Sequence, residues 1–109
     1  MHGRTVDRAC APVFAALGDS TRLGIVTRLC TGGPMSVTRL TEGTAVTRQA
    51  VSKHLRVLAE AGLLRGRRRG RERVWELEPE PLEAARRQLD MISRQWDRSL
   101  GRLRRAVER

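Results

Sequence analysis

Residues 48–77, RQAVSKHLRVLAEAGLLRGRRRGRERVWEL, constrain the fold of this chain more than any other segment. Their first part has apolar side chains at the three- and four-residue spacing of an amphipathic helix, followed by a glycine that is typical of a helix end. Their second part has apolar residues at both ends of a basic, glycine-containing centre, which indicates a β-hairpin. We therefore expect a helix over about 47–61 and a hairpin over about 63–78, with its tip near 68–71.

The residues before this segment predict a second, shorter helix. Ser36 is a suitable N-cap for a helix that ends near Gly43, and Thr47 is a suitable N-cap for the helix that follows. A helix, a short turn containing glycine and another helix form a helix-turn-helix, here over residues 36–61. Together with the basic hairpin, this arrangement predicts a winged helix of the α+β class, mainly α.

Helices are also expected on both sides of this unit, within a single domain over residues 1–109. Apolar residues at helical spacing predict helices over 6–17 and over 20–30, the second capped by Asp19 or Ser20. The second is expected to bury Leu23, Ile25, Val26, Leu29 and Cys30. A last helix over 80–108 repeats apolar residues in steps of three and four: Leu82, Ala85, Leu89, Ile92, Trp96, Leu100, Leu103 and Val107. This stripe is too long for one small domain to cover, which predicts a second copy as its partner.

The net charge of the chain points to a polyanionic partner. Lys and Arg number 22 against 12 Asp and Glu, which leaves a charge of +10, and Lys53 is the only lysine. Arginine binds phosphates and guanine edges through two hydrogen bonds at once, which favours nucleic acid over a membrane surface. The sequence has no apolar run of the ~20 residues that cross a bilayer, so we expect a cytoplasmic protein with no membrane contact.

The helix over 47–61 has two different faces. Steps of 100° place Ala50, Val51, Leu55, Val57 and Leu58 on one side and Gln49, Ser52, Lys53 and Arg56 on the other. Amide, hydroxyl and cationic groups are the set that reads base edges and phosphates in the major groove. Thr47 and Arg48 lie at the helix start, where a phosphate also meets the helix dipole. His54 falls towards the apolar side, so partial burial is expected and a phosphate contact is the alternative.

The arginines of the hairpin predict a second contact with DNA. Arg67, Arg68, Arg69 and Arg71 repel one another, and no matching acids are expected nearby, so they need an external anion such as a phosphate backbone or the adjacent minor groove. A structural nucleic-acid-binding protein without operator specificity, architectural or RNA-associated, would use the same charges. The ordered polar face formed by Gln49, Ser52 and Lys53 favours sequence-specific binding to double-stranded DNA.

The segments ALGDSTRLGIVTRL, TRQAVSKHLRVLAEAGLL and GRERVWEL resemble the ArsR/SmtB family of winged-helix repressors over about residues 10–80. The resemblance implies a homodimeric repressor of a palindromic operator, with the helix after Thr47 reading DNA. It also implies that the first and last helices form the dimer interface. The interface residues expected on these helices are Val13, Phe14, Leu17, Leu82, Leu89, Ile92 and Trp96.

The chain departs from the family pattern at the metal sites. Metal-sensing members have a cysteine pair in the helix that is occupied here by SVTRLTEGT, which has none, and His2 and His54 are the only histidines. Cys10 and Cys30 are too few for a soft-ligand site within one chain, and small buried side chains are expected for both. We therefore predict no metal and no cofactor; the inducing signal can be a small molecule, a thiol oxidant, a partner protein or none.

An enzyme is not expected either. The sequence has no GxSxG motif, no phosphate-binding loop, and no Cys-His or Ser-His pair with a plausible third partner.

Overall fold

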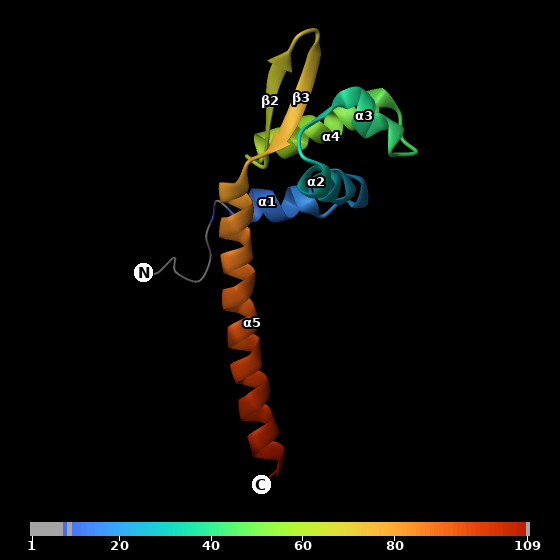
Figure 1. The fold of residues 1–109 in the computed structure, drawn as a ribbon. Coiled ribbons are helices and arrows are strands. Elements are labelled where there is room, and N and C mark those ends of the chain that lie inside the picture. The colour runs from blue at the N-terminus through green and yellow to red at the C-terminus, as the bar shows by residue number, and fades with distance from the viewer. Residues whose placement is uncertain (1–7, 9, 109) are drawn as a thin grey trace.

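The computed structural model describes Arg8 and residues 10–108, and it has the order of elements of a winged helix. These elements are α1 (Cys10–Leu17), α2 (Ser20–Gly32), β1 (Met35–Ser36), α3 (Val37–Glu42), α4 (Arg48–Glu60), β2 (Leu64–Arg69), β3 (Glu72–Leu77) and α5 (Pro79–Glu108). Residues 6, 7 and 9 of the first predicted helix lie outside the described residues. In Figure 1, α1 to α4 and the hairpin form a compact unit, and α5 extends from it as a rod. The molecule measures 67 × 32 × 20 Å.

Three helices begin at the N-caps that the sequence predicts. Asp19, Ser36 and Thr47 have extended backbones, and each side chain accepts a hydrogen bond from the N–H three residues further on, at 3.0 to 3.2 Å. Each cap thereby satisfies an N–H group for which the first helical turn has no partner. Of the two alternatives for α2, Asp19 is the cap. At the other end of α4, Gly62 has a φ of 86°, which only glycine adopts without strain.

The hairpin is the predicted wing, and it belongs to a three-stranded antiparallel sheet of order β1-β3-β2. Its register runs from Leu64 opposite Leu77 to Arg69 opposite Glu72. Gly70 has a φ of 65° and is the first of the two turn residues, the pattern of a type II′ turn. The third strand, β1, was not predicted. It places Met35 opposite Trp75 and thereby joins the base of the wing to the start of α3.

The core lies where α1, α2 and α4 meet the sheet. Ile25, Leu40, Leu55, Leu58 and Leu63 are among its fully buried side chains. A residue contributes to this core only if it faces one narrow sector of its helix, because neighbouring residues are 100° apart.

Three residues that were expected to be buried lie outside this sector. Leu23 is 50% exposed, because its position two residues before Ile25 turns it to the opposite side of α2. Cys30 is also exposed, whereas Cys10 is buried as predicted. Val57 is 38% exposed on the flank of α4, beside the buried Leu58.

The long helix α5 packs on the rest of the chain only through its first turns. Ala85 is buried against α1, and Leu82 packs against the core. Beyond this contact the large apolar side chains of the helix are exposed. Figure 1 shows that the backbone of α5 extends away from the other elements there. Across Arg8 and residues 10–108, no helix has the length and apolar character that crossing a membrane requires.

Candidate nucleic-acid interface

The side chains of α4 that the sequence assigns to DNA lie together on the exposed face of the helix. Gln49, Ser52, Lys53 and Arg56 are all exposed, whereas Val51, Leu55 and Leu58 on the other face have no exposed surface. With Thr47, Arg48 and Ala50, the four polar residues line one shallow depression of about 670 Å³. Because its apolar face is held in the core, the helix presents the polar face on a rigid support.

Arg48 has a partner within the helix-turn-helix. Its guanidinium Nη1 donates a hydrogen bond of 3.0 Å to the Thr38 hydroxyl of α3. This bond ties the start of α4 to α3 across the turn. Both side chains are exposed, so the remaining guanidinium donors of Arg48 face solvent near the N-terminus of α4.

His54 is partly buried, as the helical wheel predicts. Its Nδ1 lies 3.2 Å from Arg22 Nη1 and 3.9 Å from Asp19 Oδ2. Arg22 also donates to the Ala16 carbonyl at 2.7 Å, so this cluster joins the end of α1 to α4. The backbone hydrogen bond from the Arg22 N–H is the main cause that lowers the pKa of Asp19 below its ordinary value. The ring of His54 therefore contacts α2 and its N-cap, and its contact with DNA stays a prediction.

One of the four wing arginines, Arg67, has an acidic partner, so the expectation that no acids lie near them was wrong. Arg67 Nε lies 3.7 Å from Glu76 Oε1 on the opposite strand. Arg65 lies 3.0 Å from Glu76 and 3.3 Å from Glu78, and the hydrogen bond that its guanidinium donates to Glu76 is the main cause that raises the pKa of Arg65. The strand register brings these residues together across the hairpin, although they are distant in the sequence.

The arginines at the tip of the wing have no acidic partner among the described residues. Arg68, Arg69 and Arg71 are exposed, and none of them has an ion pair within residues 10–108. The wing therefore has an internally paired base and an unpaired cationic tip, and the tip is the part that is available to an external anion.

Sequence reasoning missed two residues on the face of the wing next to α4. The Arg73 guanidinium carbon lies 5.2 Å from the centroid of the Trp75 ring, which is a cation–π contact. Residues two apart on a strand share a face, so the hairpin prediction already contained the signal that puts these two side chains together.

The expected dimer interface is exposed on α5 but not at every position of α1. Leu89, Ile92 and Trp96 are 52%, 49% and 61% exposed, although they are large apolar side chains. Phe14, Leu17 and Leu82 are half-buried. Val13 is 1% exposed within the single chain, so it belongs to the core and has no surface left for a partner.

Within the described part of the chain, no three His, Cys, Asp or Glu side chains lie close enough to hold a metal ion. His2 lies outside the described residues.

Known proteins with the same architecture are regulators of transcription. A helix-turn-helix domain family matches residues 17–67. The HTH-type transcriptional regulator Rv2034 of Mycobacterium tuberculosis is 44% identical over 97 residues, which cover 89% of this chain and 83% of the relative. An ArsR-like transcriptional regulator from Rhodococcus sp. RHA1 superimposes with a TM-score of 0.73 at 36% identity, covering 89% of this chain and 91% of that chain.

A third relative is described as a homodimer. The homodimeric winged helix-turn-helix DNA-binding domain Mb0332 from Mycobacterium bovis matches with a TM-score of 0.62 at 25% identity, over 84% of this chain and 82% of that chain.

Proposed function

The chain belongs to the ArsR family of winged helix-turn-helix transcriptional regulators, which are DNA-binding proteins, and we propose that it is a homodimeric repressor of a palindromic operator. The observation that carries the proposal is the division of α4 into a buried apolar face and an exposed polar face. A helix held in this way can place Gln49, Ser52 and Lys53 against base edges in the major groove.

The wing supplies the second part of the interface. With α4 in the major groove, the unpaired arginines at the hairpin tip reach phosphates or the neighbouring minor groove. Arg48, at the start of α4, adds a phosphate contact beside the positive end of the helix dipole. Since a regulator of transcription acts where the DNA is, the proposal places the protein in the cytoplasm.

The exposed stripe of α5 supports the dimer. A monomer would leave Leu89, Ile92, Trp96, Leu100, Leu103 and Val107 in water along one side of the helix. A second copy related by a twofold axis would cover these side chains with the same set of its own. The two α4 helices would then be related by the same axis, which is why a palindromic operator is proposed.

The test compares operator and scrambled duplexes for single substitutions on α4. The operator is first selected from a random-sequence library with the unmodified protein. Gln49→Ala and Ser52→Ala should each weaken operator binding by about 1–3 kcal/mol and reduce sequence preference, because each removes groups that face the bases. Gln95→Ala, an exposed glutamine on α5, is the matched control and should leave both affinities unchanged.

If the α4 substitutions weaken both duplexes equally, α4 does not read sequence. The protein would then be a structural nucleic-acid-binding protein without operator specificity.

A further inference from the structure

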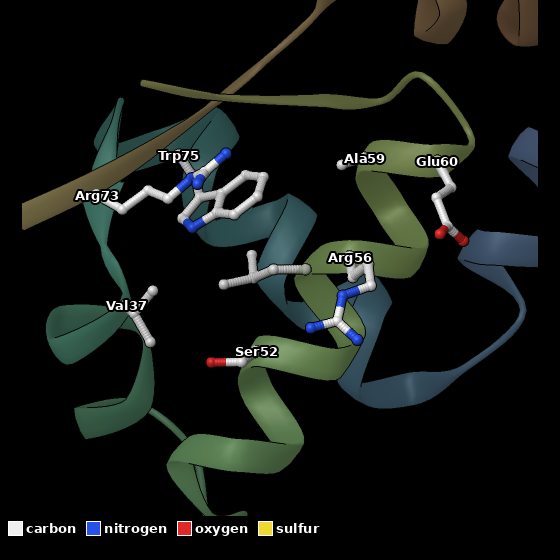
Figure 2. A pocket seen from close by; sticks show the side chains of 8 residues that line it. Val37, Ser52, Arg56, Ala59, Glu60, Arg73 and Trp75 are labelled. Atoms are coloured by element: carbon white, nitrogen blue, oxygen red, sulfur yellow. The ribbon is translucent and has the colours of Figure 1, made fainter. Parts of the chain in front are cut away.

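A cleft of about 460 Å³ separates α4 from the face of the wing that contains Trp75 (Figure 2). The residues that line it are Val37 of α3, Ser52, Leu55, Arg56, Ala59 and Glu60 of α4, and Arg73 and Trp75 of β3. Its volume lies in the range of pockets that bind small molecules. The proposed role of α4 in reading DNA uses Ser52 and Arg56 but leaves the rest of the cleft unexplained.

The cleft combines an apolar interior with two cations. Val37, Ala59 and the Trp75 ring supply apolar surface above the buried Leu55, and the guanidinium groups of Arg56 and Arg73 approach from opposite walls (Figure 2). Neither guanidinium has an ion pair within residues 10–108. The carboxylate of Glu60 lies beyond Arg56, away from Trp75 in Figure 2, so an anion is favoured at the Arg73 end.

Trp75 also has an unused hydrogen-bond donor. Its indole Nε1 is buried and has no acceptor among Arg8 and residues 10–108. An indole N–H that is buried usually has a partner, because leaving it unpaired costs free energy. In Figure 2 the nitrogen edge of the ring faces the space between Val37 and Ser52. An acceptor atom that entered this space would give the N–H a partner.

Gly66 makes room for this arrangement. It lies opposite Trp75 in the hairpin register, and a Cβ atom added there would be 2.8 Å from Arg73 Nε and 3.1 Å from Trp75 Cζ3. Any larger residue would require the Arg73 side chain to move and the Trp75 ring to shift by a few tenths of an ångström.

We propose that this cleft binds a small planar organic anion of the aromatic carboxylate class, and that the bound anion excludes DNA. The ring of the ligand would lie on the apolar surface, and its carboxylate would accept hydrogen bonds from Arg73 and the Trp75 N–H. A phosphate ion has no apolar part for this surface and is therefore a poorer fit. Exclusion of DNA follows because Ser52 and Arg56 belong to both sites, and this second half rests on the proposed function.

The direct test follows the two indole N–H signals in NMR spectra of the ¹⁵N-labelled protein, with Trp75→Phe assigning them. Sodium 2-naphthoate should shift the Trp75 signal saturably and leave that of Trp96 in place. The neutral 2-naphthamide and inorganic phosphate should each bind at least about tenfold more weakly, since one lacks the charge and the other the ring.

Variants of the cleft wall separate a built site from unspecific binding. Arg73→Gln and Gly66→Ala should each weaken naphthoate about tenfold or more, whereas Arg94→Gln, an exposed arginine of α5, should not. Naphthoate should also lower the affinity for the selected operator, and this effect should be lost in Arg73→Gln. Absence of a saturable Trp75 shift, or equal binding by the amide, would overturn the proposal. Operator selectivity of the ligand-free protein is measured separately, so failure here leaves the proposed function intact.

Discussion

The helices α4 and α5 are both strongly amphipathic, but the chain uses them in opposite ways. In α4 the apolar residues Val51, Leu55 and Leu58 have no exposed surface, and the polar face is free. In α5 the contact with the rest of the chain ends after the first turns, and Leu89 and Trp96 remain more than half exposed. One helix therefore offers solvent a polar face on a rigid base, and the other offers an apolar face.

This difference indicates the kind of partner each helix binds. A polar and cationic face suits DNA, which is hydrated and carries phosphates. An apolar stripe along a long helix suits another apolar stripe, because burial of both removes hydrocarbon from water. The two binding events are coupled in the proposal, since a dimer held by α5 sets the spacing between two α4 helices.

The largest effect is expected when the stripe of α5 is made charged. The double variant Leu89→Glu/Ile92→Glu should be monomeric, because paired stripes would bury unpaired carboxylates. Its operator affinity should fall by about a thousandfold or more, towards the level of random DNA. Sedimentation and binding curves measure both quantities. Arg94→Glu/Arg98→Glu, on the opposite side of α5, is the control and should remain dimeric. If the unmodified protein is a stable monomer at micromolar concentration, the exposed apolar stripe of α5 does not form a dimer interface.

The next effect compares one leucine from each helix. Leu55→Ala should lower the free energy of unfolding by about 2–5 kcal/mol, because the residue is fully buried within one chain. Leu100→Ala should act mainly through the dimer, so its cost should depend on protein concentration. Urea unfolding at two widely separated protein concentrations tests this. The same loss for Leu100→Ala at both concentrations would mean that α5 is stabilised within the single chain.

The sequence is sufficient to predict elements whose signals are local. The caps Asp19, Ser36 and Thr47 are predictable because a capping side chain acts three residues away, and the two faces of α4 are predictable because 100° steps are regular. The hairpin follows from its apolar ends and its glycine. These local signals together are enough to predict the helix-turn-helix, the wing and the exposed polar face of α4.

The features that were missed depend on tertiary contacts or register. β1 has two residues, too few for any periodic pattern, and it exists because β3 offers an edge. The pairing of Arg67 with Glu76 needs the hairpin register, which composition does not supply. The exposure of Leu23 depends on which side of α2 meets the core, since an apolar residue can lie on either side.

Substitutions in the wing should change DNA affinity less than those above, because the wing arginines lie on a hairpin and not on a helix packed into the core. Arg68→Ala should weaken operator and scrambled duplexes alike and lower the salt slope by about one unit, because it removes one phosphate contact. Arg65→Ala should change the slope less, since Arg65 is already paired with Glu76 and Glu78. A salt series of binding curves on both duplexes measures these slopes. Equal slopes for the two variants would show that the paired base and the unpaired tip contact DNA equally.

The smallest effect concerns two carboxylates, Asp19 beside α4 and Glu83 on α5. The Arg22 N–H lowers the pKa of Asp19, and the side-chain hydrogen bond from Arg86 lowers the pKa of Glu83. A carboxylate with a lowered folded-state pKa stabilises the protein above its ordinary pKa of about 4, and this contribution is lost as the pH falls through the folded-state value.

Asp19→Asn and Glu83→Gln should therefore lower the melting temperature slightly at pH 7, and the difference from the unmodified protein should vanish in acid below both pKa values. The asparagine still caps α2, so this variant removes the charge without removing the cap. Glu83 interacts with arginines on an exposed surface, where salt screens the attraction, so its effect should shrink at high ionic strength more than that of Asp19. Melting curves from pH 7 to acid, at low and high salt, measure both differences. If the melting temperature of Asp19→Asn differs from that of the unmodified protein by the same amount at every pH, the charge of Asp19 contributes nothing to stability. The hydrogen bond to α2 would then stabilise the helix without help from the charge.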